Sequence, residues 1–207
     1  EIRVPATPVE LAEAQKAKNE AWGFLNPDRE TSVKPIYDNF REGFLTAFVG
    51  GRGAGNFLTL RINYDISKPS KESWDQLCDK GFGGNVVRDG DSLYGVSLGV
   101  SPRYSGRGIG YMLVNRALQL TVQLNCKQFV LGCRIPDYHK YSDIPVEQYI
   151  TLKRKDGEYL DKELRFYSRC GLRFLRPLPD YMTGPWADPE CLDYGVLSVW
   201  TNPYYKK

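Results

Sequence analysis

Three glycines and two arginines lie close together in residues 100–110 of this 207-residue chain. The glycines stand at positions 106, 108 and 110, and the arginines at positions 103 and 107. Glycine leaves successive backbone N–H groups uncovered, and arginine adds full positive charge. A helix that begins at these glycines would add the partial positive charge of its dipole. This combination favours the binding of a pyrophosphate group.

The flanking residues predict the elements that would hold this glycine loop (residues 100–110). Residues 93–100 have strand character, and residues from about 109 to about 125 show the pattern of an amphipathic helix. A loop between a strand and a helix N-terminus is a common anion-binding site. The spacing is neither the G-x-G-x-x-G of dinucleotide-binding proteins nor the P-loop, which ends in Gly-Lys-Ser/Thr. The spacing therefore indicates a nucleotide-type ligand other than those bound by these two motifs.

What fits is Arg-x-x-Gly-x-Gly, formed by Arg103, Gly106 and Gly108, after Val-x-Pro and before Ile-Gly. This pattern resembles the coenzyme A loop of the GNAT superfamily of acyltransferases. The resemblance implies an α/β fold with a mixed GNAT-type central sheet flanked by helices, whose central strands splay to bind coenzyme A. It also implies a CoA thioester as substrate, with no metal. The implied CoA contacts come from the strand end and the loop: Leu98, Val100, Arg103, Tyr104, Ser105, Gly106, Arg107, Gly108, Ile109 and Gly110.

A second match to this superfamily lies at residues 164–172. Phe166 and Tyr167, followed by Gly171, resemble the late helix of the family, with Leu172 in place of the usual Phe. In that family the tyrosine often lies near the CoA sulfur and can protonate a leaving thiolate. A thiol and a phenol differ by only about one to two pKa units, so the transfer is chemically reasonable. An amphipathic helix capped by a glycine would contain the same residues, so the CoA contact and its catalytic use are two separate hypotheses.

Composition limits the class of protein. A chain of this length is most simply one domain, here residues 1–207, and its 42% hydrophobic content excludes a disordered chain. The net charge of +3 is mild and scattered, so we expect no nucleic acid partner. We expect no membrane association, because no apolar run is long enough to span a bilayer and no signal peptide opens the chain. Five cysteines without metal-type spacing indicate reduced, buried thiols in a cytoplasmic protein, and the first residue, Glu1, suggests part of a larger multidomain chain.

Outside the two matches, hydrophobic patterns predict the remaining elements. We expect a first helix at residues 8–24, capped by Thr7, and a hairpin whose strands at 44–49 and 56–64 are joined by a glycine turn at 50–55. A short helix is expected at 70–80. Further strands are expected at 129–133, 172–178 and 194–200. The order of these elements matches a mixed α/β sheet.

Residues 134–157 are longer than the connection that most GNAT proteins have at this point, and we interpret them as an insertion with its own helix at 145–155. The insertion contains the only histidine of the chain, His139. A single histidine between tyrosines is most often a packed or surface residue, but this one follows a central strand, where ligands of α/β sheets bind. The segment resembles a branch of GNAT-like proteins. Some members are fused to nitrilase-like hydrolases, and others are loading domains of polyketide synthases, such as the curacin system.

The loading-domain resemblance implies a functional set of a Trp, a Ser or Thr hydroxyl, a His and an Arg. His139 fits the histidine, Arg154 lies at a suitable distance after it, and Trp22 fits the early tryptophan. Ser97 and Ser105 are both candidates for the hydroxyl. Each residue also has an ordinary structural explanation, such as core packing for Trp22 or a solvated basic run for Arg154. Their joint occurrence is what supports the assignment.

This set suits the loss of CO2 from a malonyl-type thioester, which leaves an enolate. His139 and a serine would donate hydrogen bonds to the developing oxyanion, which is worth a few kcal/mol per donor. Arg154 would hold the departing carboxylate in its bidentate fork, and the indole of Trp22 would exclude water. No metal or second cofactor is needed for these steps.

Three functions remain open on the sequence. The first is a GNAT-like enzyme that decarboxylates malonyl- or methylmalonyl-CoA, with acyl transfer to an acyl carrier protein in polyketide chain initiation. The second is an amine N-acetyltransferase that uses acetyl-CoA, with His139 or a water as base. The third is an inactive module that binds CoA or a carrier protein. An amine acetyltransferase commonly has a glutamate base on the strand before the loop, and residues 93–100 contain no carboxylate. The nearest acids, Asp89 and Asp91, have turn character.

Overall fold

The computed structural model describes residues 1–23, 32–68 and 73–206, which fall into two compact units. The first unit comprises Glu1–Tyr64, Cys78–Phe129 and Asn202–Lys207, and the second comprises Asp65–Leu77 and Val130–Thr201. Both contain helices and sheet strands, and the described residues include seven strands in all. The predicted fold class, an α/β protein with a central sheet flanked by helices, is confirmed.

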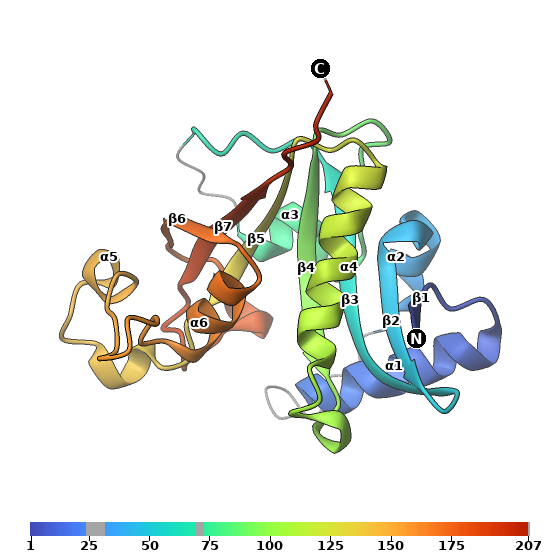
Figure 1. Ribbon diagram of the computed structural model, residues 1–207, viewed down its shortest axis with the longest axis horizontal. Helices are drawn as coiled ribbons and strands as arrows, with labels where there is room; N and C mark the ends of the chain where they lie inside the picture. Colours follow the sequence, from blue (N-terminus) through green and yellow to red (C-terminus); the bar gives the residue numbers. More distant parts are fainter. Residues whose placement is uncertain (24–31, 69–72, 207) are drawn as a thin grey trace. The chain divides into compact units, whose positions relative to one another are not determined.

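The first unit contains four antiparallel strands in the order β1-β2-β3-β4. Helix α4 lies along one face of these strands, and α1 crosses the other (Figure 1). The strands are β1 (Ile2–Arg3), β2 (Phe44–Val49), β3 (Arg52–Ile62) and β4 (Ser92–Val100). The helices are α1 (Pro8–Trp22), α2 (Lys34–Asn39) and α4 (Ile109–Gln123). Short 3-10 turns occur at Arg41–Gly43, Asp79–Gly81 and Pro102–Tyr104. The sequence did not predict β1 or α2.

Helix α1 begins as predicted. The hydroxyl of Thr7 accepts a hydrogen bond from the backbone N–H of Glu10 at 3.3 Å, and Pro8 occupies the first helical position. A cap of this kind stabilises a helix by about 1 kcal/mol. Ala14 and Ala17 are fully buried, so the helix packs closely against the sheet. The predicted last residue, Phe24, lies outside the described residues.

The hairpin differs from the prediction in the length of its turn. Only Gly50 and Gly51 form the turn, with φ of 57° and 78°, and Val49 pairs directly with Arg52. Gly53 lies inside β3, where a Cβ would come within 2.3 Å of the Glu13 carbonyl oxygen of α1. The glycine cluster therefore serves two purposes, a tight turn and a close helix–strand contact.

Strand β4 contains an irregularity that the sequence did not predict. Leu58 pairs with Ser97 and Thr59 pairs with Gly95, so Val96 is an extra residue between them. Such a bulge bends a strand and redirects the side chains that follow it. The last part of β4, from Ser97 to Val100, is partly exposed, whereas the residues before it are buried.

The second unit contains strands in the order β5-β7-β6, with β6 and β7 antiparallel. Strand β5 (Gln128–Arg134) begins in the first unit, and the other strands are β6 (Arg173–Leu178) and β7 (Gly195–Thr201). The helices are α3 (Trp74–Cys78), α5 (Val146–Tyr149) and α6 (Lys162–Arg169), with 3-10 turns at Tyr138–Tyr141 and Gly184–Trp186. The strands predicted after residue 128 are confirmed to within a few residues. The short helix predicted at 70–80 is confirmed only over α3, and residues 70–72 lie outside the described part.

The helix predicted at 145–155 is only the four-residue α5. The chain then turns, and Lys153 and Tyr159 form an antiparallel bridge. Gly157, at φ 83°, makes this reversal possible. The core of the second unit is built around Tyr181, whose ring would lie within 2.0 Å of a Cβ at Gly132 and 2.5 Å of one at Gly195.

All five cysteines are buried thiols, as predicted, and none of them forms a disulfide. Among residues 1–23, 32–68 and 73–206, no helix has both the length and the apolar character needed to cross a bilayer.

Candidate functional site

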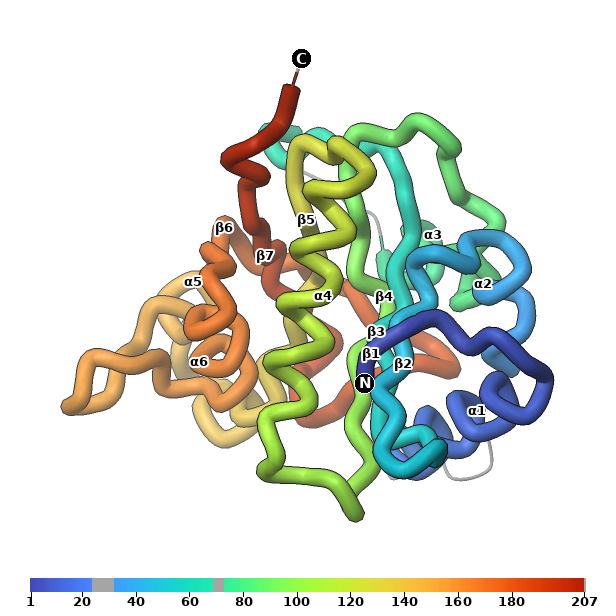
Figure 2. Tube along the Cα trace, turned by 45° about the vertical axis from the view of Figure 1, so that its right-hand side comes forward, coloured from blue at the N-terminus to red at the C-terminus, as the bar shows by residue number. Residues whose placement is uncertain are grey.

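The glycine loop leads from β4 into α4, as Figure 2 shows in green. The backbone N–H of Ser101 donates to the Ala54 carbonyl at 2.9 Å, which anchors the start of the loop on β3. Gly106 and Gly108 have φ of 74° and 73°, a conformation that side-chain-bearing residues rarely adopt. A Cβ at either position would meet no other atom within 4 Å, so the space beside both glycines is open. The loop can therefore admit a ligand against its backbone.

The N-terminus of α4 is available to an anion. Gly108 is the N-cap and provides no side-chain cap, and the first helical turn carries no acidic residue. The N–H groups of Tyr104 and Ser105 already donate to Ser101 and Pro102, at 2.9 and 3.2 Å. This geometry narrows the predicted pyrophosphate contacts to the amides of residues 106–110, where the helix dipole is strongest.

The two loop arginines differ in their surroundings. Arg103 forms an ion pair with Glu20 of α1 at 2.5 Å, and the Ser101 hydroxyl donates to the same carboxylate at 2.6 Å. Partial burial opposes ionisation of Glu20, but these two hydrogen bonds hold its pKa below the ordinary value. Arg103 thus fastens the loop to α1. Arg107 is exposed and lies 5.5 Å from the Tyr104 ring, so its charge remains available to a phosphate.

Trp22 covers the end of β4. A Cβ at Gly99 would lie 2.7 Å from Nε1 of its indole, so the ring packs directly on the strand backbone. Ser97 lies two residues earlier and faces the same side of β4, because strand side chains alternate. Leu98 and Val100 are partly exposed on the other side. The structure therefore brings Trp22 and Ser97 to one face of β4.

The other hydroxyl candidate, Ser105, is exposed and ends the 3-10 turn at Pro102–Tyr104. It lies in the glycine loop rather than on β4. Of the two serines, Ser97 is the one that shares a strand face with the residue covered by Trp22.

In the second unit, His139 lies in the 3-10 turn Tyr138–Tyr141 that follows β5. Its side chain is exposed, and its Nδ1 lies 3.1 Å from the carbonyl oxygen of Glu190. The backbone N–H of His139 donates to the same oxygen at 3.1 Å. A carbonyl only accepts hydrogen bonds, so this contact requires a proton on Nδ1. In the neutral imidazole, Nε2 is then an acceptor.

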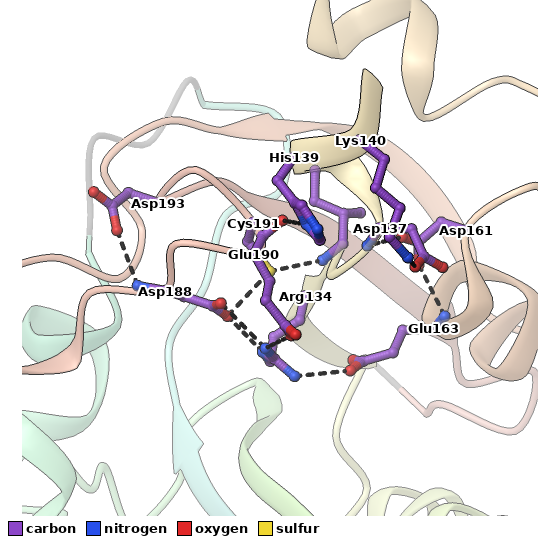
Figure 3. A network of polar contacts seen from close by, with 11 residues as sticks. Arg134, Asp137, His139, Lys140, Asp161, Glu163, Asp188, Glu190, Cys191 and Asp193 are labelled. Carbon is purple, nitrogen blue, oxygen red and sulfur yellow. Dashed lines mark hydrogen bonds and ion pairs between the residues drawn. The ribbon is translucent and has the colours of Figure 1, made fainter. Parts of the chain in front are cut away.

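Arg134, at the end of β5, is the centre of a charged cluster that the sequence analysis missed (Figure 3). Its side chain is only 11% exposed and contacts three carboxylates. Nε and Nη2 donate to Asp188 at 2.5 and 3.1 Å, Nη2 also reaches Glu190 at 3.1 Å, and Nη1 reaches Glu163 at 3.2 Å. Removing one partner from a buried ion pair commonly costs about 3–5 kcal/mol.

Burial and the charge of Arg134 shift the pKa values of the carboxyl groups in this cluster in opposite directions. Burial would raise the pKa of Asp188, but the hydrogen bond from Arg134 holds it below the ordinary value. Glu163 is affected differently, because burial raises its pKa to about 7 although Arg134 opposes the shift. Arg134 is thus paired primarily with Asp188, with Glu163 as the carboxylate that gains a proton most easily.

Arg154 lies in the exposed turn of the inserted segment. It forms an ion pair with Asp156 at 3.2 Å, and its backbone N–H donates to the Glu158 carbonyl at 2.8 Å. Both side chains of the pair are about half exposed. A pair of this kind is worth less than about 1 kcal/mol, so Arg154 can exchange Asp156 for another carboxylate.

Tyr167 is buried on α6, where its neighbour Phe166 packs edge-on against it. Burial raises the pKa of Tyr167 well above its ordinary value. The phenol therefore keeps its proton, and it is a weaker acid than an exposed tyrosine. Gly171, at φ 88°, follows α6 as the predicted C′ residue.

The predicted catalytic residues belong to two units. Trp22 and Ser97 lie together in the first unit with the whole predicted CoA loop, whereas His139, Arg154 and Tyr167 belong to the second. In the described part of the chain, no group of three His, Cys, Asp or Glu side chains could hold a metal ion.

A model of the acetyltransferase (GNAT) family matches residues 11–140 of the chain. Two Bacillus subtilis (strain 168) proteins are similar in sequence. The uncharacterized N-acetyltransferase YkwB is 37% identical over 169 residues, which cover 81% of this chain and 72% of YkwB. The probable hydrolase YhcX is 30% identical over 182 residues, 87% of this chain, but the match spans only 34% of YhcX.

Two solved structures are similar in fold over nearly the whole chain. The loading GNATL domain of CurA from Lyngbya majuscula superposes with a TM-score of 0.79 at 20% identity, covering 98% of this chain and 97% of that one. The GphF GNAT-like decarboxylase, solved in complex with isobutyryl-CoA, has a TM-score of 0.77 at 18% identity and covers 98% and 99%. These likenesses confirm the predicted fold.

Proposed function

The chain belongs to the acetyltransferase (GNAT) family, and we propose that it decarboxylates a malonyl- or methylmalonyl-type CoA thioester. The glycine loop supports the first half of this proposal. Open space beside Gly106 and Gly108, an uncapped α4 N-terminus and the exposed Arg107 suit the pyrophosphate of CoA. CoA would supply the thioester whose carbonyl takes up the negative charge, and the protein residues would hold and orient it.

In the proposed reaction, the bond between the carboxylate carbon and the α-carbon breaks. Its electron pair forms the enolate of the thioester, CO2 leaves, and a solvent proton completes the product acyl-CoA. Each residue would have the role that the loading-domain resemblance implies: His139 and Ser97 as hydrogen-bond donors to an oxyanion, and Trp22 as a wall that excludes water. Because the Glu190 carbonyl occupies Nδ1, His139 donates through Nε2 only as the imidazolium. Its positive charge would further stabilise the enolate.

The observation that carries the decarboxylation step is the lack of a carboxylate on β4. None of its nine residues is Asp or Glu, and the hydroxyl of Ser97 lies there instead, on the face that Trp22 covers. A hydroxyl donates to an oxyanion, whereas a carboxylate serves to remove a proton from an amine. Incubation with malonyl-CoA alone, followed by analysis of the products, tests this proposal.

We extend the proposal to transfer of the product acyl group to the thiol of an acyl carrier protein, as at the start of a polyketide chain. The likeness to the CurA loading domain, which covers 97% of that domain, supports this extension. In this transfer the carrier thiol loses its proton and forms a new thioester with the acyl carbon. The C–S bond to CoA breaks, and the CoA thiolate that leaves takes up a proton. Tyr167 would be its proton donor, but burial raises the pKa of this phenol, so the difference from the thiol is larger than the sequence analysis assumed.

Arg154→Ala should raise the KM for malonyl-CoA by about tenfold and leave kcat within about twofold, because the arginine would hold the substrate carboxylate before it departs. Its ion pair with Asp156 is exposed and weak, so the folded structure should not change. Steady-state kinetics with malonyl-CoA measures the effect, and the affinity for acetyl-CoA serves as the control. If Arg154→Ala weakened the binding of malonyl-CoA and of acetyl-CoA equally, Arg154 would not recognise the carboxylate.

Amine N-acetylation from acetyl-CoA is the second candidate, and one observation favours it. With Nδ1 protonated, neutral His139 presents Nε2 as a base. The likeness to the N-acetyltransferase YkwB supports the same reaction.

The two candidates require opposite protonation states of His139, which predicts opposite dependence on pH. Decarboxylation needs the imidazolium, so loss of the ring proton with rising pH should lower its rate. Acetylation needs the neutral ring, so its rate should rise. Rates measured with malonyl-CoA at a series of pH values decide the direction of the dependence, and His139→Gln should remove it. A malonyl-CoA rate that increases with pH would contradict the donor role.

A further inference from the structure

The turn that carries His139 is held from two sides within the second unit. On one side, the Glu190 carbonyl accepts from both the backbone N–H and Nδ1 of His139, each at 3.1 Å. On the other side, the buried carboxylate of Asp161, the N-cap of α6, accepts from the Asp137 N–H at 3.2 Å. Asp161 also accepts from the Tyr149 hydroxyl at 3.1 Å. The position of the imidazole is therefore set by contacts beyond its own turn.

Residues 188–193 form a tightly bonded loop around Glu190. The Asp188 carbonyl accepts from the N–H groups of Cys191 and Asp193 at 3.0 and 3.2 Å, and the Asp193 side chain accepts from the Asp188 N–H at 3.0 Å. Leu192 and Asp193 both have positive φ, 50° and 61°, a conformation that the surrounding hydrogen bonds stabilise. Cys191 joins the loop to the segment after β5, because its sulfur accepts from the Ile135 N–H at 3.3 Å.

Arg134 holds this loop at two points (Figure 3). Its guanidinium binds both oxygens of Asp188, at 2.5 and 3.1 Å, and one oxygen of Glu190, at 3.1 Å. A planar guanidinium with bidentate contacts fixes both distance and orientation. The Glu190 carbonyl is thereby fixed relative to the end of β5, from which the chain runs to His139.

We propose that the 188–193 loop locks His139 in the tautomer protonated on Nδ1, and that Arg134 is the positioning residue that holds this loop. The inference rests on the proposed function only in taking Nε2 of His139 as the atom that faces the reaction. The nearby charges are arranged in pairs. Lys140 binds Asp137 at 2.6 Å on the same turn, and Glu190 binds Arg134 on the loop. The tautomer is then set by the Glu190 carbonyl.

The test uses the single histidine of the chain. In a 15N-labelled protein without added histidine tags, a long-range 1H–15N spectrum contains the signals of one imidazole. Recorded where the ring is neutral, it reports which nitrogen carries the proton. We expect Nδ1 to carry it in the parent protein. Asp188→Asn should shift the population toward Nε2. A neutral ring could then donate through Nε2, so the fall of the malonyl-CoA rate with rising pH should become weaker than in the parent protein.

Glu190→Ala removes the loop contact of a side chain that is 43% exposed, so it tests the same link if Asp188→Asn does not fold. It should also shift the tautomer, whereas Glu190→Gln should restore the parent spectrum. Glu147→Gln, which removes an exposed carboxylate of α5, is the charge-matched control and should change nothing. A parent ring protonated on Nε2, or an unchanged tautomer in the folded Asp188 and Glu190→Ala variants, would overturn the inference. The expected tautomer without turnover of malonyl-CoA would instead count against the proposed function alone.

Discussion

Replacing His139 with alanine should lower the rate of malonyl-CoA decarboxylation by about 10²–10³-fold, while the affinity for CoA stays nearly unchanged. The loss follows from the role of the imidazole, which would donate a hydrogen bond to an oxygen that becomes charged only in the transition state. Binding is unaffected because the predicted pyrophosphate contacts are the amides of residues 106–110. The measurement is CO2 release with malonyl-CoA as sole substrate, together with calorimetry of CoA binding.

His139→Gln is the informative control for this experiment. Its side-chain amide still donates a hydrogen bond, so it should recover part of the lost rate. A residue acting as a base would recover none, because an amide does not accept a proton at neutral pH. Unchanged decarboxylation by a folded His139→Ala protein would show that the histidine has no part in the reaction.

Gly108→Asp should lower CoA affinity by about 100-fold, or about 2.7 kcal/mol. The new side chain would enter the open space beside the loop, and its negative charge would lie at the N-terminus of α4, where the pyrophosphate is expected. Isothermal titration of CoA into parent and variant gives the difference directly.

Gly51→Asp is a matched control for the backbone change. Gly51 has φ of 78°, close to the 73° of Gly108, and a Cβ there also meets nothing within 4 Å. It lies in the β2–β3 hairpin of the same unit, so any strain from the positive φ should be similar. Affinity reduced equally in both variants, or reduced in neither, would refute the assignment of the loop to CoA.

Local patterns explain why much of the fold could be predicted. Gly106 and Gly108 indicate the loop without any information from the rest of the chain, because the positive φ that they adopt is a property of the local backbone. The Thr7 cap and the apolar run of β5 are equally local. Glycine was a less reliable indicator of a turn inside β3. There, Gly53 permits close contact with α1 and does not form part of the turn.

The Arg134 cluster shows what a sequence alone does not reveal. Its partners Glu163, Asp188 and Glu190 lie 29, 54 and 56 residues away, and no periodicity connects them. An arginine at the end of an apolar strand is the only signal, because such a residue must find partners when it is buried. The extra residue at Val96 is likewise set by pairing with β3 and not by any local pattern. The roles of Ser97 and His139 depend on such long-range contacts and remain predictions.

Decarboxylation of a malonyl-type CoA thioester by this protein is tested by incubating the unmodified protein with malonyl-CoA alone and identifying the products by mass. Acetyl-CoA and CO2 should form without any acceptor, at a rate that is about 10²–10³-fold lower in His139→Ala. If malonyl-CoA is recovered unchanged while an added amine is acetylated from acetyl-CoA, the decarboxylase account is contradicted and the protein is an amine acetyltransferase.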